Sequence, residues 1–152
     1  MMTEIERKFL VQENLWGHDG GDCIAQGYLF ADAQKTVRVR LRRDKGYITV
    51  KGKTNGISRS EFEYEIPAED AEAMLNLCGD KVIKKRRHLE SIGGNLWEID
   101  VFEGANAPLV LAEIELKHEE QDFVKPPWLG EEVSYDNRYF NSYLAEHPYG
   151  AW

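Results

Sequence analysis

Apolar and charged residues alternate along most of the chain in short runs. A period of two is typical of β-strands, because successive side chains of a strand point to opposite faces of the sheet. The pattern predicts eight strands, at residues 3–11, 23–30, 35–43, 47–53, 60–66, 82–89, 96–102 and 109–117. Turn sequences between them, such as Asp44-Lys45-Gly46 and Gly93-Gly94-Asn95, favour antiparallel pairing of neighbouring strands.

Helical signals are few. Residues 67–78 predict one helix, with Pro67 at its first position, acidic residues in its first turn and Gly79 as the C-terminal cap. A second, short helix is predicted at residues 139–146 and ends before Pro148. The expected fold class is therefore mainly β (α+β), with a few flanking helices.

One face of nearly every predicted strand carries charge, and within each strand the charges are mostly of one sign. The acidic members are Glu4, Glu6, Glu61, Glu63, Glu65, Glu98, Asp100, Glu113 and Glu115, and the basic members are Lys8, Arg38, Arg40, Arg42, Lys51, Lys53, Lys85 and Arg87. Two structures are compatible with this pattern: a sheet with one solvated face, or a closed barrel whose charges point inward. Like charges two positions apart repel, so a purely solvated face has no reason to segregate them.

A charged barrel interior predicts a particular kind of ligand. Arginine-rich strands suit a polyanion, because a guanidinium group can bind two phosphate oxygens at once. Carboxylate-rich strands suit hard divalent cations. A phosphate chain bridged to a metal ion satisfies both zones, whereas confined charges without partners are strongly destabilising.

The bulk composition narrows the function classes. The 152 residues carry a net charge of −8, which argues against a general nucleic-acid surface. No apolar run approaches the roughly 20 residues of a membrane span, and the N-terminus lacks the pattern of a signal peptide. We therefore expect one cytoplasmic domain over residues 1–152. The spacing of Cys23 and Cys78 predicts free thiols, and the scattered His18, His88, His118 and His147 predict no site.

The N-terminal sequence Glu4-Ile5-Glu6-Arg7-Lys8 resembles the ExExK signature of CYTH domains, the triphosphate tunnel metalloenzymes. The resemblance extends over essentially the whole chain. It includes Gln26-Gly27-Tyr28-Leu29, the paired charges on the later strands, and the ending Asp136-Asn137-Arg138-Tyr139-Phe140-Asn141. It implies a closed eight-stranded antiparallel β-barrel, so the charged faces are expected to point inward.

The resemblance also implies roles for the charged residues. It assigns Mg²⁺ or Mn²⁺ binding to Glu4, Glu6, Asp100, Glu113 and Glu115, and phosphate binding to Lys8, Arg38, Arg40, Lys51, Lys53, Lys85 and Arg87. Catalysis is then attack of a metal-positioned water on the terminal phosphorus, with Glu4 and Glu6 on the metal and Lys85 orienting or deprotonating the water. Glu61 and Glu63 are expected to support the basic strands, and the roles of Glu98, Tyr28 and Arg138 stay open.

The implied activity is hydrolysis of a triphosphate. Inorganic tripolyphosphate is the preferred substrate, because a short chain leaves little apparatus for recognising a base. The alternatives are cyclisation of ATP to cyclic AMP, and hydrolysis of thiamine or nucleoside triphosphates. A binding module without catalysis is the alternative from another class, but it predicts loss of the metal-binding carboxylates. Outward apolar residues also raise the hypothesis of a homodimer.

Overall fold

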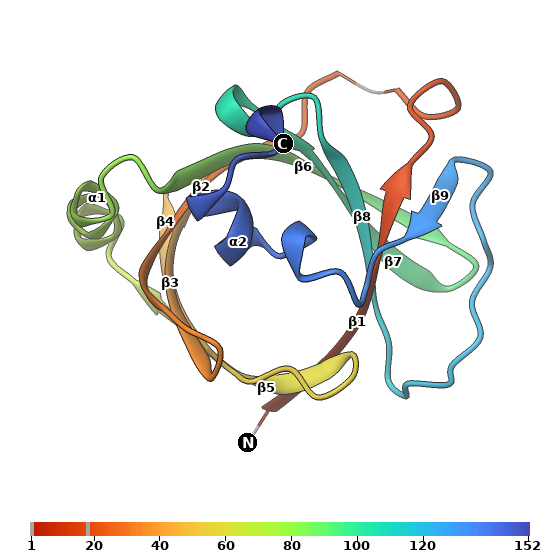
Figure 1. Cartoon of the computed structure of the whole chain (residues 1–152), viewed down its shortest axis with the longest axis horizontal. Coiled ribbons are helices and arrows are strands. Elements are labelled where there is room, and N and C mark those ends of the chain that lie inside the picture. The colour runs from red at the N-terminus through yellow and green to blue at the C-terminus, as the bar shows by residue number, and fades with distance from the viewer. Residues whose placement is uncertain (1, 18) are drawn as a thin grey trace.

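Eight antiparallel strands close into a barrel (Figure 1). The computed structural model of the protein describes residues 2–17 and 19–152, so His18 lies outside the described residues. The strands are β1 Met2–Val11, β2 Asp22–Ala31, β3 Lys35–Arg42, β4 Lys45–Gly52, β5 Ser58–Ile66, β6 Val82–Ile92, β7 Asn95–Phe102 and β8 Val110–Glu115. Their spatial order is β5-β4-β3-β2-β6-β7-β8-β1, and pairing of β5 with β1 closes the ring. The predicted barrel and its eight strands are confirmed.

The sequence pattern did not predict a ninth strand. Strand β9, Leu129–Glu132, pairs with the C-terminal part of β1, beyond the part of β1 that pairs with β5. It has only four residues and follows Pro126-Pro127, so no alternation is long enough to predict it. In Figure 1 it lies outside the ring, beside β1 and β7.

Both predicted helices are present, with corrected ends. Helix α1 spans Ala68–Leu77, so Pro67 is its N-cap and not its first helical residue. Gly79 follows the C-cap and has a φ of +65°, a left-handed conformation that favours glycine. The second region divides into the 3₁₀ turn η2, Asn137–Tyr139, and the short helix α2, Asn141–Glu146. Two further 3₁₀ turns are η1, Gly104–Asn106, and η3, Tyr149–Ala151.

The turn between β3 and β4 differs from the predicted one. The pairing of Arg42 with Lys45 leaves Arg43 and Asp44 as the two turn residues, and Arg43 adopts a φ of +57°. Gly46 lies within β4, where an added Cβ atom would meet the Cβ atom of Ala71 on α1 at 2.6 Å. This glycine therefore permits close packing of α1 on the barrel wall and does not form the turn.

Most of the apolar core lies outside the barrel wall. Phe9, Trp97 and Ile114 point outward from β1, β7 and β8 and pack with Trp16 and Trp128 from the surrounding segments. A second cluster, which includes Ile83, Leu111 and Leu144, fills the end of the barrel that the C-terminal region covers, since Ile83 and Leu111 share the inward strand faces of Lys85 and Glu113. Helix α1 covers a third part of the outer face, at Val39. The rest of the barrel interior is left for charged side chains.

In the described part of the chain, no helix is both long enough and apolar enough to cross a bilayer. Figure 1 shows α2 and the turn before it lying across the opening of the ring, whereas α1 lies outside the ring beside β2, β3 and β4. The C-terminal segment therefore covers one end of the barrel.

Candidate active site

A cavity of about 160 Å³ lies inside the barrel and is lined mainly by charged side chains. Its acidic lining residues are Glu4, Glu6, Glu61, Glu63, Glu98, Glu113 and Glu115, and its basic ones are Lys8, Arg38, Arg40, Lys51, Arg59, Lys85 and Arg87. The remaining lining residues are Tyr28, Thr36, Phe140, Asn141 and Ser142. Acidic and basic side chains thus occur in equal number around one space.

The strand order separates these charges into two halves of the wall. Strands β5, β1, β8 and β7 are consecutive in the barrel and carry the acidic lining residues. Strands β6, β2, β3 and β4 form the opposite half and carry most of the basic ones. Lys8 and Arg59 are the basic lining residues on the acidic half. A ligand in this cavity therefore lies between a cationic wall and an anionic wall.

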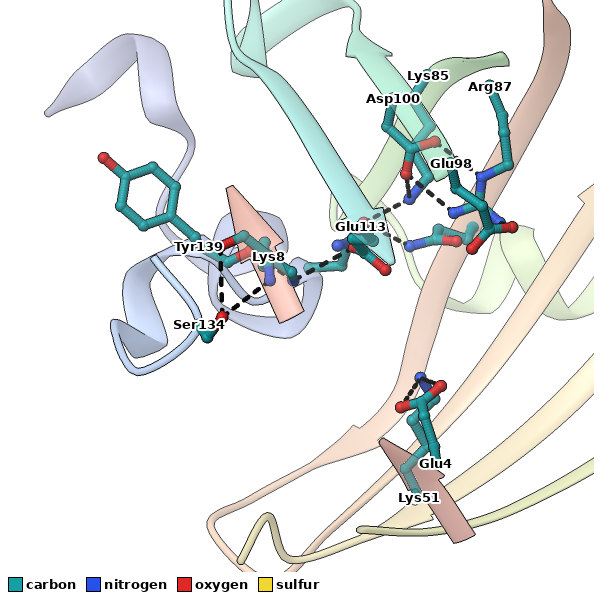
Figure 2. A network of polar contacts seen from close by, with 12 residues as sticks. Glu4, Lys8, Lys51, Lys85, Arg87, Glu98, Asp100, Glu113, Ser134 and Tyr139 are labelled. Atoms are coloured by element: carbon teal, nitrogen blue, oxygen red, sulfur yellow. Dashed lines mark hydrogen bonds and ion pairs between the residues drawn. The ribbon is translucent and has the colours of Figure 1, made fainter. Parts of the chain in front are cut away.

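Lys85 and Arg87 on β6 are held by a carboxylate of the next strand (Figure 2). Asp100 on β7 accepts hydrogen bonds from both Nε and Nη2 of Arg87, at 2.8 and 2.9 Å, and its Oδ2 lies 2.7 Å from Nζ of Lys85. Burial lowers the pKa of Lys85 to about 7, even though Asp100 acts in the opposite direction. Burial would raise the pKa of Asp100, but Lys85 and Arg87 outweigh it and keep that pKa far below its usual range.

The arginines of β3 are buried and differ in how fully they are engaged. Arg40 donates from Nε and Nη2 to Oε1 of Gln26, at 2.9 and 2.7 Å. Arg38 donates from Nη2 to the hydroxyl of Thr49 and lies 3.8 Å from Glu63. Among the described residues, the buried Nε of Arg38 has no hydrogen-bond partner. A buried guanidinium with an unused donor in a cavity is suited to an anionic ligand.

The acidic wall is crowded with carboxylates. Glu4 accepts two hydrogen bonds from Nζ of Lys51 at 3.0 Å and lies 3.3 Å from Nε of Arg59. Burial would raise the pKa of Glu4, but Lys51 and its other partners lower it to about 2. Burial, with Glu113 and Glu4 nearby, raises the pKa of Glu6 to about 8. Burial and the hydrogen bond with Glu4 raise the pKa of Glu61 to about 7.

Lys8 connects the acidic wall with the C-terminal segment. Its Nζ lies 3.4 Å from Glu113 and donates a hydrogen bond of 3.1 Å to the backbone carbonyl of Tyr139. The same ammonium lies 5.2 Å from the centre of the Phe140 ring. Figure 2 shows this connection beside the Asp100 network, with the pair of Glu4 and Lys51 farther along the cavity. The covering segment is therefore bonded to the charged interior.

Most residues predicted for the site line the cavity, including Tyr28, but three do not. Asp100 lies behind the lining side chains, and its two carboxylate oxygens are engaged by Lys85 and Arg87. Lys53 is exposed beyond the end of β4 and borders a second groove near α2, which adjoins the cavity. Arg138 is exposed and pairs with Asp136 at 2.7 Å. Two further charges that shared the inward pattern, Arg42 and Glu65, also lie outside the lining.

Three kinds of lining residue were missed by the sequence pattern. Thr36 lies within a predicted strand but carries no charge. Arg59 shares the inward parity of Glu61, but the predicted strand began one residue after it. Phe140, Asn141 and Ser142 reach the cavity from the C-terminal segment, not from a strand. The parity of strands carries no signal for residues of that kind.

The acidic wall has the donors that a divalent cation requires. Glu6 lies opposite Glu115 in the pairing of β1 with β8, and Glu113 lies opposite Lys8. A divalent cation suits this wall, because carboxylates crowded by burial and like charge are relieved by positive charge. In the described residues, no three acidic, histidine or cysteine side chains are already arranged as a metal centre. Metal binding would require Glu4 and Glu113 to exchange their contacts with Lys51 and Lys8.

Comparison with known proteins identifies the family. The CYTH domain matches residues 2–142. An inorganic triphosphatase of Acetivibrio thermocellus is 49% identical over 151 residues, which are 98% of this chain and 97% of that protein. An inorganic triphosphatase of Nitrosomonas europaea is 38% identical over 149 residues, covering 95% of this chain and 97% of that protein. A crystal structure of an inorganic triphosphatase is 36% identical, covers 95% of both chains and superposes with a TM-score of 0.67. The chain belongs to the CYTH domain family.

Proposed function

We propose that this chain hydrolyses inorganic tripolyphosphate to pyrophosphate and orthophosphate inside the barrel. The observation that carries the proposal is the division of one cavity into a cationic wall and a carboxylate wall. The two relatives named inorganic triphosphatases support the choice of substrate, since each aligns with nearly the whole chain. The whole of residues 1–152 is proposed to act as one domain.

The cationic wall is proposed to bind the phosphate chain. Arg38 has an unused buried donor, and the two hydrogen bonds to Asp100 fix the orientation of the Arg87 guanidinium. Lys51, Lys8 and Arg59 are paired with carboxylates and become available when those carboxylates turn to a cation. Such binding neutralises the oxygens of the ligand in a site of low dielectric, where charge complementarity is strong.

The carboxylate wall is proposed to hold Mg²⁺ or Mn²⁺, and the CYTH family generally uses divalent metals. Glu4, Glu6, Glu113 and Glu115 are the proposed ligands, because their side chains line the cavity. Asp100 is given a different role from the one that the sequence suggested. Because its oxygens are engaged by Lys85 and Arg87, it is proposed to orient the cationic wall. A bound divalent ion supplies charge neutralisation and an activated water.

The chemical step is proposed to be in-line attack of water on the terminal phosphorus. The bridging P–O bond breaks, its electrons remain on the pyrophosphate oxygen, and the water loses a proton. Lys85 lines the cavity and is proposed to orient that water as an ammonium or to accept its proton as a neutral amine, a form made accessible because burial lowers its pKa to about 7. The arginines stabilise charge on the transferring phosphoryl group without covalent chemistry.

Product analysis separates this reaction from its alternatives. Phosphorus NMR of a tripolyphosphate reaction with Mg²⁺ is expected to show equal amounts of pyrophosphate and orthophosphate. With ATP, the appearance of cyclic AMP and pyrophosphate without orthophosphate would establish a cyclase. Release of orthophosphate from thiamine triphosphate or from ATP, with none from tripolyphosphate, would establish a triphosphatase with a different substrate. Tight binding of every compound without turnover would indicate a binding module.

A cytoplasmic location and a homodimer are also proposed. Cys23 and Cys78 are free thiols, as expected in a reducing compartment. Phe62 and Tyr64 on β5 are 38% and 62% exposed, and a second subunit is proposed to cover them. Sedimentation equilibrium at micromolar concentrations tests the dimer, and a purely monomeric profile would exclude it.

A further inference from the structure

Two neutral amides connect two separate cations of the cavity. Oδ1 of Asn141 accepts a hydrogen bond of 2.9 Å from Nζ of Lys85 and one of 2.8 Å from Nε2 of Gln26. Oε1 of Gln26 in turn accepts from Nε and Nη2 of Arg40, at 2.9 and 2.7 Å. All four side chains are at most 9% exposed. We call the Gln26 and Asn141 side chains the amide bridge.

The orientation of the amide bridge is fixed by the chemistry at its two ends. Arginine and lysine are donors only, so Gln26 must turn its oxygen toward Arg40 and Asn141 must turn its oxygen toward Lys85. The amide nitrogen of Gln26 then faces the Asn141 oxygen and donates to it. Each amide oxygen accepts two bonds, which uses both of its lone pairs. Turning either amide over would place a donor against a cation.

The two ends of the amide bridge come from distant parts of the chain. Gln26 is a β2 residue of the cationic wall, whereas Asn141 is the first residue of α2 in the segment that covers the barrel. Lys85 has Asp100 as its other partner, which approaches from β7. The position of the Lys85 ammonium is therefore set jointly by the barrel wall and by the C-terminal segment.

We propose that Gln26 and Asn141 are positioning residues that fix the Lys85 ammonium and the Arg40 guanidinium in the geometry for phosphoryl transfer. This inference rests on the proposed triphosphatase function. It assigns a catalytic purpose to the C-terminal segment, which supplies the oxygen that completes the cationic wall. A misplacement of about 1 Å in a reacting group can lower a rate by about 10²-fold, so loss of the amide bridge should lower kcat.

Steady-state kinetics with tripolyphosphate and Mg²⁺ tests the proposal with three variants. Asn141→Ala removes the oxygen that Lys85 and Gln26 share. Gln26→Glu keeps an acceptor for Arg40, but it replaces the donor nitrogen with an oxygen that faces the acceptor oxygen of Asn141. Each is expected to lower kcat by about 10- to 100-fold with a smaller change in KM, because the other cations still bind the phosphates. Asn141→Asp keeps the acceptor oxygen with the same shape and is expected to regain most of the lost kcat.

Asn106→Ala is the matched control. Asn106 is also buried and also holds the C-terminal segment, through a 2.9 Å bond from the Tyr149 backbone N–H to its Oδ1, but it does not line the cavity. Its loss should lower the melting temperature and leave kcat unchanged. If Asn141→Ala and Gln26→Glu keep the wild-type kcat, or lose no more than Asn106→Ala, the proposal is wrong. If Asn141→Ala does not fold, the kcat of Gln26→Glu is compared with that of Asn141→Asp. A lower kcat for Gln26→Glu alone supports the proposal, and equal values would overturn it.

Failure of the proposed function has a different signature. In that case the wild-type protein itself does not turn over tripolyphosphate, whatever the variants do. The amide bridge is then tested by crystal structures of the wild-type protein and Asn141→Ala. Displacement of the Lys85 ammonium from its wild-type position in the variant supports positioning by Asn141. An unmoved Lys85 would overturn it.

Discussion

Nζ of Lys85 and Oδ2 of Asp100 lie 2.7 Å apart, with side chains only 1% and 2% exposed. Asp100 also receives two hydrogen bonds from Arg87, so one buried carboxylate holds two cations of the same strand. A carboxylate that is fully engaged in this way cannot turn freely to another ligand. The pair therefore fixes the position of Lys85, and Asp100 counteracts the effect of burial on the Lys85 pKa.

Replacing Asp100 should destabilise the fold strongly. Asp100→Ala leaves Lys85 and Arg87 buried without the carboxylate that they share, and breaking a buried pair costs about 3–5 kcal/mol of unfolding free energy. The surface pair of Asp136 and Arg138 provides the control, because Asp136→Ala at an exposed pair should cost about 0–1 kcal/mol. Urea denaturation measures both. Equal stability of Asp100→Ala and wild type would refute the role assigned to Asp100.

Metal binding should stabilise the protein through Glu6. Mg²⁺ or Mn²⁺ at 100 times its dissociation constant is expected to add about 2.7 kcal/mol of stability, because the ion binds the folded state alone. Glu6→Gln removes a ligand and should abolish this increase without lowering the melting temperature of the metal-free protein, since it also relieves the crowding with Glu113 and Glu4. Calorimetry with and without the ion measures the effect. A metal-induced increase that survives in Glu6→Gln would contradict the ligand assignment.

Arg38 should act through its forked shape as well as its charge. Arg38→Lys keeps the charge but cannot give the paired donors of a guanidinium, so we expect kcat/KM for tripolyphosphate to fall on the order of 10²-fold. Arg138→Lys, at an exposed position outside the cavity, is the matched control and should leave kcat/KM unchanged. Similar kinetics for the two variants would place phosphate binding elsewhere.

Gly46→Ala should weaken the packing of α1 without disturbing the cavity. The added Cβ would lie 2.6 Å from the Cβ of Ala71, and overpacking of this kind costs about 1–3 kcal/mol. Gly52→Ala on the same strand is the control, because its Cβ would meet Ser60 at an ordinary 3.5 Å. Thermal unfolding should show a lower midpoint for the first variant only, with kinetic constants of the folded protein retained in both.

The ion pair of Arg7 and Glu132, which joins β1 to β9, should make stability depend on pH. The Arg7 hydrogen bond lowers the pKa of Glu132 in the folded state. A lowered folded-state pKa gives stability that is present above the unfolded value, about 4.3, and is lost as the pH falls through the folded value. The stability difference between wild type and Glu132→Gln should be below about 1 kcal/mol at pH 7 and should shrink toward pH 3. A difference that grows on acidification would contradict this pairing.

Strand parity predicted which side chains face the cavity, but not how deeply they lie or what they contact. Asp100 and Glu98 share one face of β7, yet only Glu98 lines the cavity, since its neighbours leave it 34% exposed. Lys53 has the inward parity but lies past the end of β4. Position along the barrel axis depends on stagger between strands, and a single sequence does not reveal that stagger.

The sequence pattern also did not predict site roles for neutral residues or for residues outside the strands. Gln26 lies within a predicted strand, but its side chain is neutral and the pattern of charges therefore does not indicate its role. Asn141 reaches the cavity only because the C-terminal segment folds back over the barrel, which local periodicity does not determine. By contrast, the alternation of apolar and charged residues was sufficient to predict the strands and their two faces. The choice of a closed barrel over an open sheet came from the resemblance to CYTH domains.

Whether the protein is a metal-dependent inorganic triphosphatase is tested most directly by the rate of phosphate release. This rate is measured with tripolyphosphate and with ATP, in the presence of Mg²⁺ and in the presence of a chelator. The result predicted is rapid release from tripolyphosphate that requires the metal, is much slower from ATP, and is lost in Glu6→Gln. If release from tripolyphosphate does not exceed the uncatalysed rate with any divalent metal, the barrel is not an inorganic triphosphatase.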